Sequence, residues 1–218
     1  MRPWLLALLL LGAPVARADH RASGAITGRV AVRAGDQPRD DRSSVVVYLD
    51  PAPPGPRRAP RRHEMWQRDK AFAPRLLVVQ KGDIVEFPNG DHIFHNVFSL
   101  SKGQSFDLGL HKTGTRPSST FDRAGTVDVF CNIHPQMSAS IKVLDTGYFA
   151  VTDRAGDFRI PAVPPGTYAL VAWTPQGKEV RHPVTVAPGK TLEVSLELVE
   201  TRRVRDHVRK DGTPYPRY

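Results

Sequence analysis

The sequence predicts an all-β protein of one or two domains, and both its length and its turn residues favour this class. A chain of 218 residues is long enough for one or two domains that each bury a core. Twenty prolines and 17 glycines separate many short valine-rich runs, as turns separate strands. The hydrophobic share of 40% and the charged share of 24% are ordinary for a globular protein.

Residues 1–18 have the pattern of a secretory signal peptide. Arg2 precedes an apolar run, and Ala16-Arg17-Ala18 is a small-residue cleavage pattern. The apolar run is too short to span a bilayer, although an uncleaved membrane anchor is the alternative. We therefore expect cleavage after Ala18, no transmembrane span in the mature chain, and a periplasmic or otherwise exported location.

The charge of the chain favours acidic partners. The formal net charge is +9, and loss of Arg2 and Arg17 with the signal peptide leaves +7. A basic exported protein can meet acidic redox proteins or an anionic surface. No RNA-binding or helix-turn-helix pattern accompanies the charge, so nucleic acid is not an expected partner.

Apolar alternation and turn residues predict strands along most of the mature chain. The first two are expected at 25–32 and 44–49. A middle group is expected at 65–67, 76–79, 84–87, 95–99, 126–131 and 139–143, with a looser region at 106–120. A hairpin at 148–160 and strands at 163–173, 184–187 and 192–198 complete the pattern.

Two segments lack such a pattern. Residues 51–63 form a Pro/Arg-rich linker, because its prolines exclude both a helix and a central strand. We expect a solvated connector there, with a docking arm for an acidic partner as the alternative. The basic tail at 200–218 is expected to fray, with contact to a partner or to anionic lipid as the alternative.

The single cysteine lies in the motif Cys-x-x-His-x-x-Met, formed by Cys131, His134 and Met137. In an exported chain, a lone cysteine without a partner is buried, joined to another chain, reactive or bound to metal. A thiolate, an imidazole and a thioether together suit a copper ion that cycles between Cu(I) and Cu(II).

Such a site needs a second imidazole, and we expect it from His95. In the strand 95–99, His95 shares one face with Val97 and Ser99. His92 lies nearer turn residues and is interpreted as a loop histidine, and His111 as a surface residue. Each ligand taken singly is more often a core residue, but the joint spacing favours a metal site.

The segments Phe72-Ala73-Pro74, Gly82–Asn89, His95-Asn96-Val97 and Phe130–Met137 resemble those of a cupredoxin, with spacing similar to amicyanin and pseudoazurin. The resemblance covers residues 64–146. It implies one type 1 (blue) copper ion, with an equatorial plane of two histidines and a cysteine and a weak axial methionine; these ligands are His95, Cys131, His134 and Met137. It also implies that Asn96 ties the first ligand strand to the cysteine loop, and that electrons pass near His134 through an apolar patch of Phe94, Ile133 and Pro135.

Residues after 147 resemble a second family. The motifs Thr152-Asp153-x-x-Gly156-x-Phe158 and Pro164–Tyr168 are similar to the carboxypeptidase regulatory-like domain, a small transthyretin-like β-sandwich that is an accessory module. The first two strands of that family match Gly28-Arg29-Val30 and Val45–Leu49. We therefore hypothesise a discontinuous sandwich of residues 24–50 and 147–199, with the cupredoxin domain, 64–146, inserted. The alternative is a tandem order in which 24–50 adds strands to the cupredoxin.

The predicted function is transfer of single electrons between exported redox proteins, such as a dehydrogenase, a c-type cytochrome or an oxidase. Proteins that join these two modules are often linked with methylamine utilisation, and this chain looks similar. No enzyme activity is expected, because the eight histidines contain no His-x-His pair of the kind that multicopper oxidases use. Copper delivery or buffering in the periplasm, and binding by a non-redox β-sandwich, are the alternatives.

Overall fold

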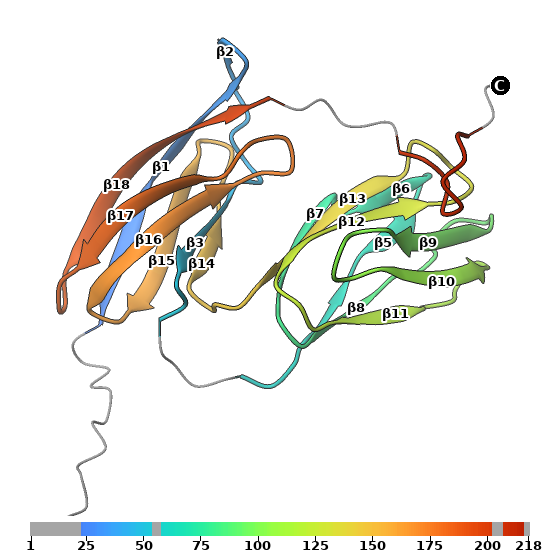
Figure 1. The fold of residues 1–218 in the computed structure, drawn as a ribbon, viewed down its shortest axis with the longest axis horizontal. Coiled ribbons are helices and arrows are strands. Elements are labelled where there is room, and N and C mark those ends of the chain that lie inside the picture. The colour runs from blue at the N-terminus through green and yellow to red at the C-terminus, as the bar shows by residue number, and fades with distance from the viewer. Residues whose placement is uncertain (1–22, 54–57, 202–206, 216–218) are drawn as a thin grey trace, which may run out of the picture.

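The computed structural model describes residues 23–53, 58–201 and 207–215, and these residues form strands β1 to β18 with no helix among them. The fold is all-β, as predicted. Figure 1 shows two groups of strands, with the blue and orange strands on one side and the cyan to yellow strands on the other. The predicted signal peptide lies outside the described residues. Within the described residues, no helix is long and apolar enough to cross a membrane.

The first group is a sandwich of two sheets. One sheet has the order β15-β1-β18, with β2 on the edge of β1, and the other has the order β14-β3-β16-β17. Their bounds are β1 (Gly24–Ala34), β2 (Gln37–Pro38), β3 (Val46–Asp50), β14 (Phe149–Val151), β15 (Asp157–Val163), β16 (Gly166–Trp173), β17 (Val180–Val186) and β18 (Thr191–Glu200).

Alternating side chains fill the space between these two sheets. In β18, Val194, Leu196 and Leu198 are buried while the residues between them are exposed, as expected of a strand with one face on a core. β1 runs parallel to β18 for ten residues, and a Cβ atom on Gly28 would lie 1.9 Å from the carbonyl oxygen of Val194. Glycine at position 28 therefore permits the close approach of the two strands.

The second group holds a separate core. A five-stranded sheet has the order β10-β9-β12-β13-β7, a three-stranded sheet has the order β11-β8-β4, and β5 pairs with β6. The bounds are β4 (Arg62–Glu64), β5 (Trp66–Arg68), β6 (Ala71–Ala73), β7 (Leu76–Gln80), β8 (Asp83–Glu86), β9 (His95–Ser99), β10 (Phe106–His111), β11 (Ser118–Phe121), β12 (Gly125–Cys131) and β13 (Ser138–Leu144). Its core includes Phe87, Val97, Phe121, Val129 and Ile141.

In the first group, strands from before the second group in the sequence pair with strands from after it. β1 pairs with β15 and β18, and β3 pairs with β14 and β16, so the chain leaves the sandwich after Asp50 and re-enters it at Phe149 (Figure 1). This is the pairing that an inserted second domain requires. The domain limits drawn from the sequence stay predictions.

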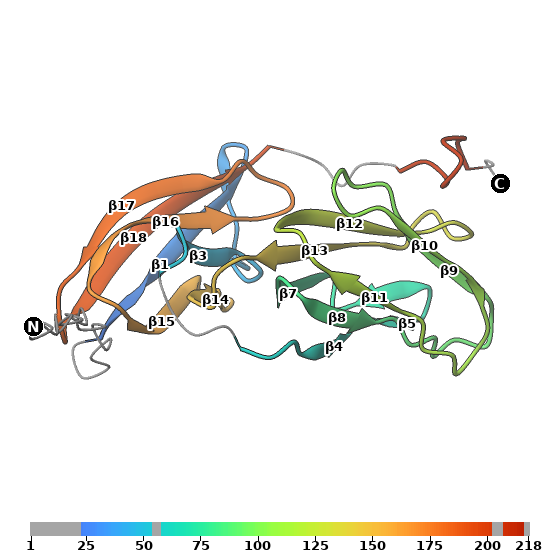
Figure 2. The ribbon, with the colours of Figure 1, turned by 60° about the horizontal axis from the view of Figure 1, so that its bottom comes forward.

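The two groups also pack against each other. Val46 and Trp173 of the sandwich form a buried cluster with Leu144 at the end of β13. The ammonium group of Lys142 lies 4.5 Å from the centroid of the Trp173 ring and 5.3 Å from that of Tyr48. Burial lowers the pKa of Lys142. Figure 2 shows β13 pointing towards the sandwich, and Leu144 at this contact is its last residue.

The segment predicted to be a linker is anchored to the second group at its end. The guanidinium of Arg58 donates to both carboxylate oxygens of Asp83, at 2.7 and 2.5 Å, and Nε2 of His63 lies 2.9 Å from Oδ2 of the same residue. The Asp83 side chain is fully buried. β4 already begins at Arg62, inside the range 51–63, and residues 54–57 lie outside the described ones.

Candidate metal centre

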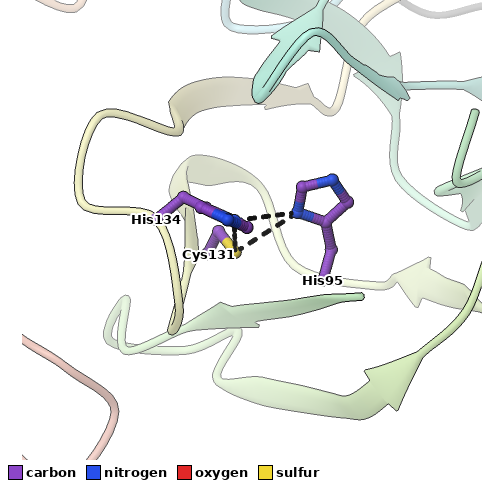
Figure 3. A group of neighbouring side chains, drawn as sticks. All are labelled: His95, Cys131 and His134. Carbon is purple, nitrogen blue, oxygen red and sulfur yellow. Dashed lines mark hydrogen bonds between the residues drawn. The ribbon is translucent and has the colours of Figure 1, made fainter. Parts of the chain in front are cut away.

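Two neighbouring strands present the predicted ligands at one end of the five-stranded sheet. His95 is the first residue of β9, and Cys131 is the last residue of β12. These strands pair antiparallel, with Cys131 opposite Val97, so the start of one lies beside the end of the other. His134 follows on the loop from β12 to β13, and Figure 3 shows the three side chains pointing toward one another.

The ligand atoms form a small triangle. Nδ1 of His95 lies 3.1 Å from Nδ1 of His134, and Sγ of Cys131 lies 3.8 Å from the first nitrogen and 3.7 Å from the second (Figure 3). A single ion can lie about 2 Å from all three atoms, which is the usual length of a metal–histidine bond. Two imidazoles and one thiolate in trigonal arrangement are the donor set of a type 1 copper site.

Met137 closes the ligand loop. Its side chain is fully buried in the same core cluster as Cys131. Its N–H donates to the carbonyl of His134 at 3.0 Å, and its own carbonyl accepts from the N–H of Cys131 at 3.2 Å. The loop is therefore bonded across its base. The role of Met137 as an axial ligand stays a prediction.

The surroundings of Cys131 favour its thiolate. Burial of the sulfur opposes ionisation, but contact with His95 and hydrogen bonds from backbone N–H groups outweigh it, so the pKa of Cys131 is lower than usual. The N–H groups belong to Asn96, Ile133 and His134. Metal binding requires the deprotonated sulfur. The backbone N–H groups lower the free energy that is needed to remove the proton.

A carboxylate sets the orientation of His95. Its Nε2 lies 2.9 Å from Oδ2 of Asp91, which leaves Nδ1 facing Cys131 and His134. Burial lowers the pKa of His95, but the nearby Cys131 and Asp91 outweigh it and the pKa is raised. The Asp91 carboxylate also accepts from the backbone N–H groups of Asp69, at 2.7 Å, and Lys70, at 3.0 Å. The ring of His95 is therefore held by a group that is itself fixed. The sequence analysis did not identify Asp91, which lies in a turn before the ligand strand.

The ring of His134 is partly exposed, unlike that of His95. Burial, the charge of His95 and the charge of Lys70 lower the pKa of His134. These effects keep its imidazole neutral and able to bind metal at neutral pH.

Asn96 connects β9 to the cysteine loop through its backbone. The carbonyl of Asn96 accepts from the N–H of Asn132 at 3.1 Å, and the backbone N–H of Asn96 donates to the sulfur of Cys131. The side-chain amide of Asn96 points elsewhere and donates to Oδ1 of Asp107 at 2.6 Å. Its Oδ1 is buried without a hydrogen-bond partner among the described residues.

The side chains that were predicted to form an apolar patch are all exposed. Phe94 is 53% exposed, Ile133 is 42% exposed, and Pro135 is also exposed. Two further apolar side chains that the sequence analysis missed, Ile93 and Leu110, are exposed as well. Leu110 lies opposite Asn96 in the β9–β10 pair, which places it next to the ligand strand.

The prediction that His111 lies at the surface is wrong. It is buried, and its Nε2 lies 2.9 Å from Nε2 of Gln67 and 3.2 Å from Oε1 of that residue. The reason is an irregularity in β10 between Asp107 and Leu110, which shifts the alternation of the strand. His111 then lies opposite His95, while His92 is exposed in a loop, as predicted.

The comparisons with known proteins give two kinds of match. The sequence model of the carboxypeptidase regulatory-like domain matches residues 124–199. This range begins with β12 and β13, and it leaves out β1 and β3, which complete the two sheets of the sandwich. No curated protein matches the chain.

Several solved structures resemble part of the chain. A Cu(I) form of an amicyanin variant is 25% identical over 37% of this chain and 80% of its own, with a TM-score of 0.35. A purple cupredoxin from Nitrosopumilus maritimus is 22% identical over 37% of this chain and 98% of its own, also with a TM-score of 0.35. A reduced amicyanin variant is 23% identical over 45% of this chain and 98% of its own, with a TM-score of 0.37.

Strand order, ligand geometry and the family match together describe the two parts of the molecule. The triangle of His95, Cys131 and His134 at the ends of β9 and β12, with buried Met137 on the same loop, suggests a type 1 copper site. One part of the chain is thus similar to the carboxypeptidase regulatory-like domain, and another part carries a His-Cys-His site in a region that resembles amicyanin.

Proposed function

We propose that this protein is an exported carrier of single electrons that binds one type 1 copper ion and catalyses no reaction of its own. The observation that carries the proposal is the triangle of 3.1, 3.7 and 3.8 Å between the two Nδ1 atoms and the sulfur. When bound, copper would supply a one-electron couple between Cu(II) and Cu(I).

The chain supports this role by holding its donor atoms in place. His95 is fixed by Asp91, Cys131 by backbone N–H groups and the pairing of β12, and His134 by a loop bonded across its base. Ligands held in one arrangement suit both oxidation states, so electron transfer requires little movement of the protein.

The surface around His134 supports docking of another redox protein. The imidazole is partly exposed, the neighbouring Ile133 and Pro135 are exposed, and Lys70 lies close enough to lower the pKa of His134. An apolar centre with a basic residue at its rim suits a partner that is apolar with an acidic rim. We propose a dehydrogenase, a c-type cytochrome or an oxidase as that partner. A quinoprotein dehydrogenase of methylamine utilisation is one candidate donor.

The test is the mature protein loaded with Cu(II). We expect an intense blue charge-transfer band and reversible one-electron voltammetry, both lost in Cys131→Ser because the thiolate is removed. The matched control is His92→Gln, which changes an exposed histidine three residues from His95 and leaves the band intact. A colourless copper protein contradicts the proposal. Rapidly exchanging copper without a reversible couple would instead indicate delivery or buffering of the metal.

A further inference from the structure

The C-terminal segment His207–Tyr215 lies against the cysteine end of β12, at the end of the cupredoxin-like region remote from the sandwich (Figures 1 and 2). It follows β18 of the sandwich, with residues 202–206 outside the described ones. The prediction that the tail frays is therefore wrong for this segment, which makes specific contacts with the loop that carries Cys131.

Two hydrogen bonds join the segment directly to the ligand loop. The phenol of Tyr215 donates to the carbonyl oxygen of Cys131 at 2.5 Å. The backbone N–H of Lys210 donates to the side-chain oxygen of Asn132 at 2.9 Å. Both acceptors belong to the first two residues of the Cys131-Asn132-Ile133-His134 run, so the segment holds the loop where it leaves the strand.

Stacked rings support these bonds. His207 lies face to face with Phe130, with centroids 4.2 Å apart and planes 18° apart. Tyr215 meets His207 edge-on, with centroids 5.1 Å apart, and its hydroxyl lies 3.1 Å from Nε2 of His207. Burial and the charge of Cys131 raise the pKa of Tyr215 to about 12. The phenol therefore keeps its proton near neutral pH.

An ion pair extends the contact to the other ligand strand. Nζ of Lys210 lies 2.6 Å from Oδ2 of Asp107. The other carboxylate oxygen of Asp107 accepts from the side chain of Asn96, which follows His95 and is bonded to Asn132 through its backbone. The segment thus reaches both strands that carry ligands.

We propose that His207–Tyr215 is an intramolecular clasp that holds the Cys131 loop against β9 and raises the reduction potential of the metal centre, with Tyr215 as its main positioning residue. The inference rests on the proposed copper function. The phenol directs the positive end of its O–H dipole towards the carbonyl of Cys131, and Lys210 offsets the negative charge of Asp107. Both effects favour the reduced centre, which carries one positive charge less.

The experiment compares Tyr215→Phe and a chain ending at residue 206 with the full mature chain. The matched control is Tyr168→Phe, which removes a phenol-to-carbonyl hydrogen bond of 3.0 Å to Pro164 in the sandwich. We expect a lower reduction potential in both clasp variants, and about tenfold faster loss of copper to a chelator. We also expect faster hydrogen exchange of the Asn132 amide in the copper-free protein. Tyr168→Phe leaves all three unchanged.

The readouts separate this proposal from the copper function. One outcome is that the full chain binds copper with a reversible couple while both clasp variants have the same reduction potential and the same Asn132 exchange rate as the full chain. That result overturns the clasp proposal. If the full chain binds no copper, the function fails, but hydrogen exchange at Asn132 still tests the clasp. Faster exchange with an unchanged potential overturns the electrostatic part of the proposal.

Discussion

Asp91 joins the tip of the β5–β6 hairpin to the candidate ligand His95, since its carboxylate accepts from the backbone N–H of Lys70 and lies 2.9 Å from Nε2 of His95. Nothing in the spacing of the ligands requires this residue. Its position makes the orientation of the His95 ring depend on a hairpin that is distant in sequence.

Replacement of Asp91 by Asn therefore weakens copper binding. We expect Asp91→Asn to lower the affinity about 10-fold to 100-fold, the usual effect of losing a carboxylate that orients a histidine ligand. Competition with a copper chelator measures the change. Asp122→Asn, at an exposed aspartate of the same region, is the control and leaves the affinity unchanged. Equal affinities in the two variants would show that Asp91 does not orient His95.

Asp83 makes the cupredoxin-like region sensitive to acid. Burial alone raises its pKa, but hydrogen bonds from Arg58, from two backbone N–H groups and from His63 lower the pKa well below its usual value. A lowered pKa stabilises the fold above the pKa of the unfolded chain, about 3.9. This stability decreases as the pH falls from there towards the folded-state pKa.

Urea unfolding at several pH values tests this linkage. At pH 7 we expect Asp83→Asn to lower the free energy of unfolding by about 2 kcal/mol, because buried donors lose their charged acceptor. The difference in the free energy of unfolding between wild type and Asp83→Asn narrows as the pH falls below about 3.9. The control Asp145→Asn disrupts an exposed pair with Lys81 and changes the stability by under about 1 kcal/mol. If this difference stays constant with pH, the lowered pKa of Asp83 is not the cause of the acid sensitivity.

Leu144 connects the two parts of the molecule. It is 3% exposed and packs with Val46 and Trp173 of the sandwich. Leu144→Ala is expected to lower the free energy of unfolding by about 3 kcal/mol, through lost burial and the cavity that remains. Leu100→Ala, at a 53% exposed position, is the matched control and changes it by about 0.5 kcal/mol or less. Differential scanning calorimetry measures both, and equal effects would show that the contact contributes little.

The apolar patch can be tested without knowing the redox partner. Ile133→Asp adds a charge beside His134, and we expect it to slow electron self-exchange between oxidised and reduced copies about tenfold, equivalent to about 1.4 kcal/mol. Nuclear magnetic resonance line broadening measures the rate. Leu100→Asp places the same charge just beyond the opposite end of β9 and leaves the rate unchanged. If both variants slow exchange equally, electrons do not pass at the patch.

Local spacing was enough to predict the ligand triangle and the strand that holds its first member. The strand expected at 95–99 is β9, and Cys-x-x-His places Cys131 and His134 on one short loop. His111 was misplaced because the irregularity in β10 changes which side chains face the core. Asp91 and Tyr215 were missed because their contacts with His95 and Cys131 depend on where a turn and the chain end fold back, which strand periodicity does not encode.

The pairing of Phe149 with Tyr48 places the exit from the sandwich and the return to it on adjacent strands. An excision of the intervening residues would leave two antiparallel neighbours that a tight turn can rejoin, with their hydrogen bonds intact. The residues between Asp50 and Phe149 therefore take the place that a hairpin turn would occupy in the sandwich.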